Sequence, residues 1–188
     1  MINPDFEKLL KDSFINGFDM SLKDCLPNEQ WEIKELRENK GVERNEAVVL
    51  TISSHLFRII YFFYFTNDEK CQSFITNGLN IKNENLPESR VYDYLCEVGN
   101  SFFGSVKRTL GNTVTSLGMS TPNILDSSSF KYVDELKIDS SGCAVAELNG
   151  EPLFYASYHI SASGELNFAV AQNQKAEEDV DSGELEFF

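Results

Sequence analysis

The segment from Ile59 to Phe65 restricts the possible folds more than any other part of the chain. It reads Ile-Ile-Tyr-Phe-Phe-Tyr-Phe, with no charged residue, glycine or proline. β-Branched and aromatic residues of this kind favour a strand. Because both faces of such a strand are apolar, it must be covered on both sides of a sheet or pair along its edge with another copy; left open, it would aggregate. We therefore expect a central or dimer-forming strand here.

This apolar run does not indicate a membrane protein. Its full extent, from Leu56 to Phe65, is too short to cross a bilayer, for which about 20 residues are needed, and Arg58 interrupts it. The opening Met-Ile-Asn-Pro-Asp lacks the basic and apolar regions of a signal peptide. The sequence therefore predicts a cytoplasmic protein without a membrane partner.

Two long helices are expected. Asn3 is a good N-cap and Pro4 suits the first helical position, after which apolar residues recur at helical spacing as far as Cys25. Pro87 suits the first position of a second helix that should end near Gly111. Its apolar residues repeat every three or four positions: Val91, Leu95, Val98, Phe102 and Val106. Residues 66–69 should start a shorter helix that stops at Gly78.

The remaining segments read as strands. Alternating or β-branched residues predict strands at 31–35, 47–53, 117–125, 130–136, 143–148, 153–160 and 165–171. Asn149-Gly150 is a type I′ hairpin signal between two of them. The predicted fold class is α+β, with an antiparallel β-sheet and long helices packed on one face.

The chain divides into one domain and a tail. Its 188 residues fit a single domain of about 150 residues with a little left over, which we place at 1–171. Residues 172–188 form an acidic C-terminal tail with a net charge of −5, which leaves −9 on the domain. The tail is either a segment without a specific role or, because Leu185, Phe187 and Phe188 stand near its end, a docking motif.

Charge and cysteine usage exclude several classes of function. Sixteen Lys and Arg against thirty Asp and Glu give a net charge of −14, the wrong sign for a surface that neutralises phosphates, so no nucleic acid partner is expected. The four cysteines form no CxxC pair and the two histidines stand alone. This pattern argues against a metal site and favours reduced thiols.

The second long helix has a polar face as well as an apolar one. At about 100° per residue, a stripe opposite the apolar face collects Asp93, Glu97, Asn100, Gly104 and Arg108. Glu97 and Asn100, three positions apart, project together, so a carboxylate and an amide can reach one small target. A glycine within a helix costs about 0.5–1 kcal/mol relative to alanine, so Gly104 suggests that a partner backbone approaches there.

This arrangement resembles the signature of the CheC/CheX/FliY chemotaxis phosphatases. The family pattern is an Asp or Ser, a Glu four positions later and an Asn three after that, matched here by Asp93, Glu97 and Asn100. A proline follows after about 22 intervening residues, where this chain has 21 between Asn100 and Pro122. The first helix offers Asp19 and Lys23 where a second Glu/Asn pair would lie. The single pair is similar to the CheX branch rather than to two-site CheC.

The resemblance implies a phosphatase that removes the phosphoryl group from the aspartyl phosphate of a CheY-like response regulator. Asn100 would orient the attacking water, and Glu97 would anchor to the regulator's active-site lysine. Asp93, Gly104 and Arg108 are expected to bind this partner. The resemblance further implies a homodimer, no cofactor bound by this chain, and Mg²⁺ bound by the regulator.

Other functions are weaker hypotheses. A non-catalytic dimeric adaptor that binds a response regulator or signalling protein without hydrolysis is the alternative, and the intact Glu97 and Asn100 argue against it. A P-loop would need a lysine directly after Gly104, where the chain has a serine. A serine or cysteine hydrolase lacks a nucleophile motif near either histidine, and Cys96 should pack at the flank of its helix.

Overall fold

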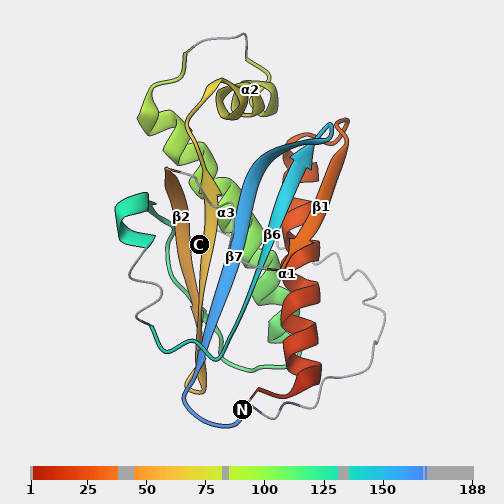
Figure 1. Cartoon of the computed structure of the whole chain (residues 1–188), viewed down its shortest axis with the longest axis vertical. Helices are drawn as coiled ribbons and strands as arrows, with labels where there is room; N and C mark the ends of the chain where they lie inside the picture. Colours follow the sequence, from red (N-terminus) through yellow and green to blue (C-terminus); the bar gives the residue numbers. More distant parts are fainter. Residues whose placement is uncertain (1, 38–44, 82–84, 131–135, 167, 169–188) are drawn as a thin grey trace, which may run out of the picture.

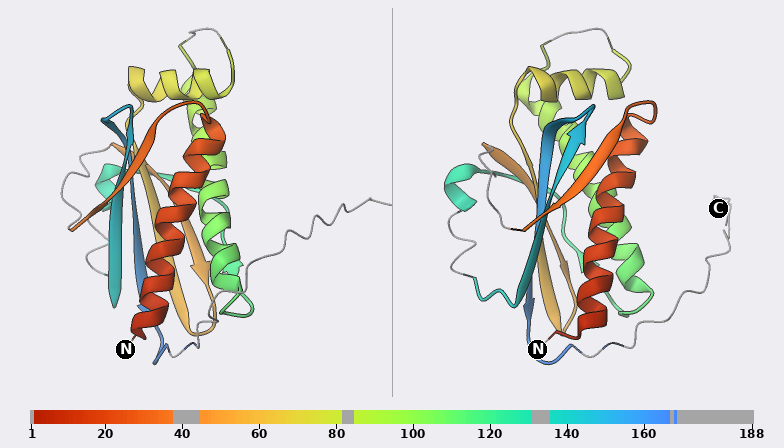
Figure 2. Two further views of the ribbon diagram at one scale, coloured as in Figure 1. Left: turned by 90° about the vertical axis from the view of Figure 1, so that its right-hand side faces the viewer. Right: turned by 45° about the vertical axis from the view of Figure 1, so that its right-hand side comes forward.

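Two long helices, α1 (Pro4–Cys25) and α3 (Glu88–Gly111), lie side by side across one face of a single antiparallel sheet (Figure 1). The computed structural model describes residues 2–37, 45–81, 85–130, 136–166 and 168. A third helix, α2 (Glu69–Gly78), crosses one end of the molecule. Seen from the side, the helices form one layer and the sheet the other (Figure 2). The α+β class predicted from the sequence is confirmed.

The helix ends follow from local chemistry. The Asn3 side chain accepts a hydrogen bond from the Asp5 amide at 2.8 Å, and Pro4 opens α1. Asp68 caps α2 through the Cys71 amide at 2.9 Å. Pro87 is the N-cap of α3 rather than its first helical residue, with extended backbone and no side-chain cap. The predicted ranges of all three helices are confirmed, with that shift of one position.

Over the described residues the sheet has seven strands in the order β1-β6-β7-β3-β2, with β4 and β5 both paired to the outer edge of β2. Every pairing is antiparallel. The strand bounds are β1 Trp31–Leu36, β2 Glu46–Ser53, β3 Phe57–Phe65, β4 Gly118–Met119, β5 Asn123–Asp126, β6 Ser140–Leu148 and β7 Glu151–Ala162. Asn149 and Gly150 join the last two with φ of 54° and 86°, so the predicted type I′ turn is confirmed.

The aromatic strand β3 lies inside the sheet, between β7 and β2. Tyr61 and Phe63 face the helices and are fully buried in the main core. Phe62 and Tyr64 face the other way, where they form a second apolar cluster with Ala47. Of the two positions that the sequence allowed, central and edge-paired, the central one is therefore observed. Both edges of β3 are used within the chain, so this strand offers no edge to a second copy.

The close packing of α1 on α3 depends on Gly17. A Cβ on Gly17 would come within 3.2 Å of the Phe102 carbonyl oxygen and 3.1 Å of a Val106 methyl group. Phe18 stacks on Phe102 with ring centroids 5.0 Å apart. This contact fixes the position of α3, and with it the direction in which its outer face points.

Three strand predictions need correction or fall outside the described residues. The strand predicted at 117–125 is broken into β4 and β5, because Pro122 has no amide hydrogen for the ladder. Of the strand predicted at 130–136, residues 131–135 lie outside the described part of the chain. Of that at 165–171, only Leu166 is seen to pair, in an isolated bridge with Ile2, and 167 and 169–171 are not described.

The domain boundary predicted at residue 171 and the acidic tail 172–188 also lie outside the described residues. Among the helices that the structure does describe, none is long and apolar enough to cross a membrane.

Candidate functional site

The outer face of α3 carries the polar stripe expected from the sequence. Its buried face packs Val91, Leu95, Val98, Phe102 and Val106 into the main core. On the opposite side Asp93, Glu97, Asn100 and Arg108 are exposed and Gly104 is half-buried. Acidic residues therefore lie toward the start of the helix and basic ones toward its end, the order that the helix macrodipole favours.

Glu97 and Asn100 have no polar partner among the residues that the structure describes. Neither side chain makes a hydrogen bond or an ion pair with any residue that the structure describes. Tyr92, on the preceding turn, differs: its hydroxyl donates to Glu88 at 2.7 Å and contacts Glu46 of β2. The start of α3 is thus tied to the sheet, while the carboxylate of Glu97 and the amide of Asn100 remain available to a partner.

Gly104 is not required by the packing of this chain. A Cβ built on it would meet no described atom within 4 Å. Gly99, one and a half turns earlier, is different, because its Cβ would come within 2.9 Å of Val48 Cγ1 on β2. Gly99 therefore serves the fold, whereas the absent side chain at Gly104 leaves open space on the outer surface.

A groove runs along the second half of α3, and we call it the α3 groove. It encloses about 690 Å³ and is lined by Asn100, Gly104, Lys107 and Arg108 of α3, and by Leu117 and Met119 of the chain that returns to the sheet. Of the predicted site residues, the structure thus brings Asn100, Gly104 and Arg108 together. Asp93 and Glu97 lie on the same face of α3 but outside the groove.

The sequence reasoning missed Lys107. It was left out because it lies beside the polar stripe rather than on it, and only the path of residues 114–119 makes it part of the groove wall. No acidic side chain of the described part of the chain lines this groove. Neither Lys107 nor Arg108 pairs with a described carboxylate.

The segment Ser120-Thr121-Pro122 holds the far wall of the groove on the sheet. The Ser120 amide donates to the Thr51 carbonyl at 2.9 Å, and the Ser120 hydroxyl accepts from the Thr51 amide at 3.0 Å. Met119 pairs with Ile52 and Asn123 with Val49. The segment 119–123 therefore has one more residue than the segment 49–52 of β2 that it faces. The extra residue lies within 120–122, between the two paired segments.

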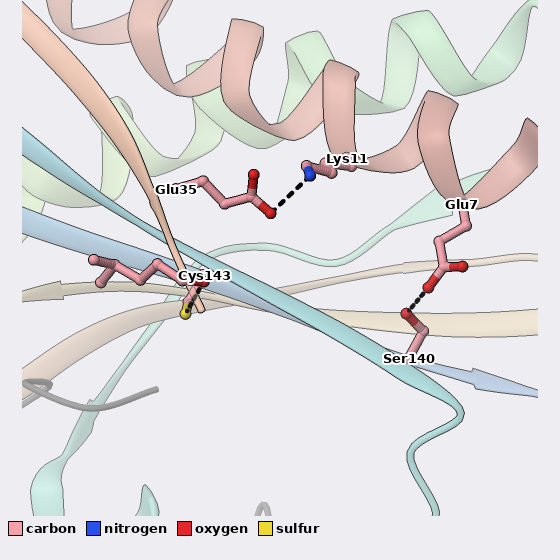
Figure 3. Close-up of polar contacts among 6 residues, drawn as sticks. Glu7, Lys11, Glu35, Ser140 and Cys143 are labelled. Carbon is pink, nitrogen blue, oxygen red and sulfur yellow. Dashed lines mark hydrogen bonds and ion pairs between the residues drawn. The ribbon is translucent and has the colours of Figure 1, made fainter. Parts of the chain in front are cut away.

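The corresponding flank of α1 differs (Figure 3). There Lys11 forms an ion pair with Glu35 at 2.7 Å, and Glu7 accepts a hydrogen bond from Ser140. Further along α1, Lys23 is paired with Asp19 at 2.7 Å. These polar side chains of α1 are engaged within the chain, so α1 does not present a second free carboxylate and amide at the positions compared in the sequence.

The surroundings of Cys96 disfavour its reactive thiolate form. The thiol is half-buried, and burial, with a smaller contribution from the carboxylates of Asp93 and Glu97, raises its pKa. A raised pKa lowers the fraction of reactive thiolate at neutral pH. The position predicted from the sequence, at the flank of the helix, agrees with this environment.

One serine–histidine contact was not foreseen. On the sheet face away from α3, Ser157 Oγ lies 3.1 Å from His159 Nε2 and 3.0 Å from the Tyr64 hydroxyl. Ser157 is fully buried, so no substrate reaches it. Burial raises the pKa of Tyr64 to about 12, which keeps the phenol neutral within this network. The contact is structural, and the other histidine, His55, is exposed in the β2–β3 turn.

No group of three or more His, Cys, Asp or Glu side chains within the described ranges is placed to hold a metal ion. The outer face of α3 offers two carboxylates, an amide and two basic side chains, a set that can bind and orient a partner or a water molecule.

Comparison with protein-family models finds no match, and comparison with curated proteins finds none either. Solved structures do resemble the chain. CheX from Vibrio vulnificus is 16% identical with a TM-score of 0.59, and the match covers 79% of this chain and 99% of that one. The chain has the CheC/CheX fold. The resemblance seen in the sequence is thus confirmed at the level of the fold.

Two further solved structures also resemble the chain. A chain of the CheX-CheY-BeF3-Mg²⁺ complex from Borrelia burgdorferi is 15% identical over 79% of this chain and 96% of that chain, with a TM-score of 0.61. FliY from Thermotoga maritima is 11% identical over 86% and 91%, with a TM-score of 0.55. The CheX-like fold therefore spans nearly the whole length of these structures.

Proposed function

We propose that this protein is a phosphatase that removes the phosphoryl group from the aspartyl phosphate of a CheY-like response regulator. The observation that carries the proposal is the free Glu97 and Asn100 pair on the outer face of α3. It stands on a fold that is also found in a structure of CheX with CheY, BeF3 and Mg²⁺.

In this proposal the outer face of α3 enters the active site of the regulator. The carboxylate of Glu97 accepts hydrogen bonds from the ammonium group of the regulator's active-site lysine, which holds α3 beside the acyl phosphate. A charge-assisted hydrogen bond of this kind both orients and stabilises the complex. Mg²⁺ belongs to the regulator, where it neutralises the phosphoryl oxygens.

The amide of Asn100 holds the attacking water. Its carbonyl oxygen accepts one hydrogen of the water and so directs the oxygen lone pair at phosphorus. The new P–O bond forms as the bond between phosphorus and the aspartyl oxygen breaks, and the products are inorganic phosphate and free aspartate. Because phosphoryl transfer depends chiefly on positioning and charge, no covalent step on this chain is needed.

The other stripe residues bind the partner. The open space over Gly104 lets a regulator backbone approach α3 more closely than any side chain would permit. Arg108, exposed two turns beyond Asn100, can contact acidic groups of the regulator, and Asp93 lies on the same face near the start of the contact.

The proposal includes a cytoplasmic homodimer. Because β3 is interior, any sheet edge used for pairing belongs to β1 or to the β4–β5 side.

The test of function is to phosphorylate candidate regulators from the same cell with a small phosphodonor and to follow their decay with and without this protein. Accelerated decay supports the phosphatase. Tight binding without acceleration would favour the adaptor instead.

A further inference from the structure

The α3 groove has the opposite charge to most of the molecule. The domain carries a net charge of −9, yet two adjacent basic residues, Lys107 and Arg108, line this groove without an acidic neighbour among the described residues. Other described lysines, such as Lys34 and Lys70, are paired with Glu147 and Glu151. The groove is thus prepared for an acidic ligand, and nothing in the described part of the chain supplies one.

The groove also has an apolar wall. Val114 is buried, and Leu117 and Met119 are half-buried along its far side. A ligand that combines carboxylates with large apolar side chains fits both walls. The acidic tail has this composition, with Glu177, Glu178, Asp179 and Asp181 followed by an apolar end.

The last described residue, Phe168, lies near the turn between β2 and β3, at the end of the molecule where the chain leaves α3. Phe168 packs on Phe57 with ring centroids 6.2 Å apart. Phe57 closes the turn that begins at Ser53, and Ser53 pairs with Gly118, next to Met119 of the groove. In Figure 2 this turn and the chain that follows α3 lie at the same end of the molecule.

The intervening chain is long enough to reach. From Phe168 to Glu177 is nine residues, which span up to about 30 Å when extended. The groove follows α3 from Gly111 back to Asn100, eleven residues or about 17 Å of helix. The segment from Phe168 to Glu177 is thus longer than the groove, as a tail that pairs with Lys107 and Arg108 while Phe168 keeps its place on Phe57 requires.

We propose that residues 177–188 of the acidic tail bind in the α3 groove. Carboxylates of the tail pair with Lys107 and Arg108. The apolar residues Leu185, Phe187 and Phe188 contact Leu117 and Met119. Because Asn100 lines the same groove, the bound tail covers part of the surface that a response regulator would use, and it competes with the regulator. This regulatory role rests on the proposed phosphatase function; the contact itself does not.

A tethered competitor acts at an effective concentration of about 1 mM, so even a weak contact is well populated. The test compares the full chain with a variant carrying Glu177→Gln, Glu178→Gln, Asp179→Asn and Asp181→Asn. At low salt, amide resonances of residues 100–119 should differ between the two proteins while those of α2 coincide. Replacing Gln172, Asn173 and Gln174 with alanine is the control within the tail and should move none of them.

Charge reversal in the groove provides the matched control. In a chain with Lys107→Glu and Arg108→Glu, neutralising the tail should no longer move resonances 100–119. Lys8→Glu, which reverses a charge in the corresponding hollow beside α1, should leave the response intact. The inference is wrong if neutralising the tail leaves the resonances of residues 100–119 unchanged. It is also wrong if those resonances still move in the chain with Lys107→Glu and Arg108→Glu.

The kinetic measurement tests competition. With tail-neutralised protein, kcat/KM for dephosphorylation of the regulator should rise about threefold or more at low salt with kcat unchanged, because only free α3 binds the regulator. An unchanged KM would remove the regulatory role. If neither protein accelerates decay, the proposed function fails, and the resonance shifts still decide whether the tail binds.

Discussion

Gly99 lies against Val48, so closely that a Cβ on Gly99 would come within 2.9 Å of Val48 Cγ1. This contact seats α3 on β2 and turns the next residue, Asn100, outward to the groove. Because Val48 is fully buried and branched at Cβ, it cannot move aside easily. The site therefore depends on a residue that is itself hidden from any partner.

The two glycines of α3 should respond differently to alanine. Gly99→Ala should destabilise the protein by about 1 kcal/mol or more, since the overpacking cost of about 1–3 kcal/mol exceeds the gain in helix propensity of about 0.5–1 kcal/mol. Gly104→Ala should leave the protein equally stable or slightly more stable, yet weaken regulator binding. Urea unfolding of both variants checks the first expectation and a binding titration the second. Equal losses of stability in the Gly99→Ala and Gly104→Ala proteins would contradict the first expectation.

The Ser157 network should affect stability and not activity. Ser157→Ala removes the hydrogen-bond partner of the buried Tyr64 hydroxyl and should cost about 1–3 kcal/mol. Because the sheet separates this network from α3, dephosphorylation per folded molecule should be unchanged. The double variant with Tyr64→Phe should cost less than the sum of the single changes. A loss of activity with normal stability would instead make Ser157 part of a second site.

Cys96 should react slowly with alkylating reagents. Its pKa is raised by burial and by the neighbouring carboxylates, so the rate should rise at higher pH than for a cysteine in an unstructured peptide. Asp93→Asn removes one of these carboxylates and should move the midpoint to lower pH. Peptide mapping separates Cys96 from the other three cysteines. If Cys96 reacted faster than the peptide cysteine at neutral pH, that result would contradict the raised pKa.

The chain should be a homodimer in solution. Light scattering at micromolar concentration should give twice the mass of 21.3 kDa. Since β3 is interior, a charge introduced on it would test folding rather than assembly, so the protein to measure is the unaltered chain. A monomer at micromolar concentration, from the unaltered chain, would count decisively against the dimer.

Much of the fold could be predicted because its signals are local. Asn3 and Pro4 define the start of α1 by their own chemistry, and the aromatic run at Ile59–Phe65 has few places in a sheet where it can be covered. The break in the strand predicted at 117–125 also had a local signal, because Pro122 has no amide hydrogen for the ladder. The register of β4 and β5 against β2 could not be predicted in the same way, because it is set by residues about 70 positions away.

The candidate site likewise has one part that local sequence signals predict and one part that depends on residues distant in the sequence. The exposed stripe follows from helical period alone, whereas the α3 groove depends on how residues 114–119 return past Lys107. The Ser157–His159 contact had a usable signal, because positions i and i+2 of a strand share a face. Because Ser157 lies in no nucleophile motif, a motif-based prediction does not reveal this pair.

The most direct test of the central claim is single-turnover decay of a phosphorylated regulator with Asn100→Ala. The side chain makes no contact that the fold needs, so the free energy of unfolding should change by less than about 0.5 kcal/mol, while decay should slow by about 10²-fold or more. Glu97→Ala should also weaken regulator binding, and the two losses should not add. Asn112 is an exposed asparagine just after α3 and serves as the control. With Asn112→Ala the phosphorylated regulator should decay at the same rate as with the unaltered protein. Normal decay with Asn100→Ala would contradict the mechanism.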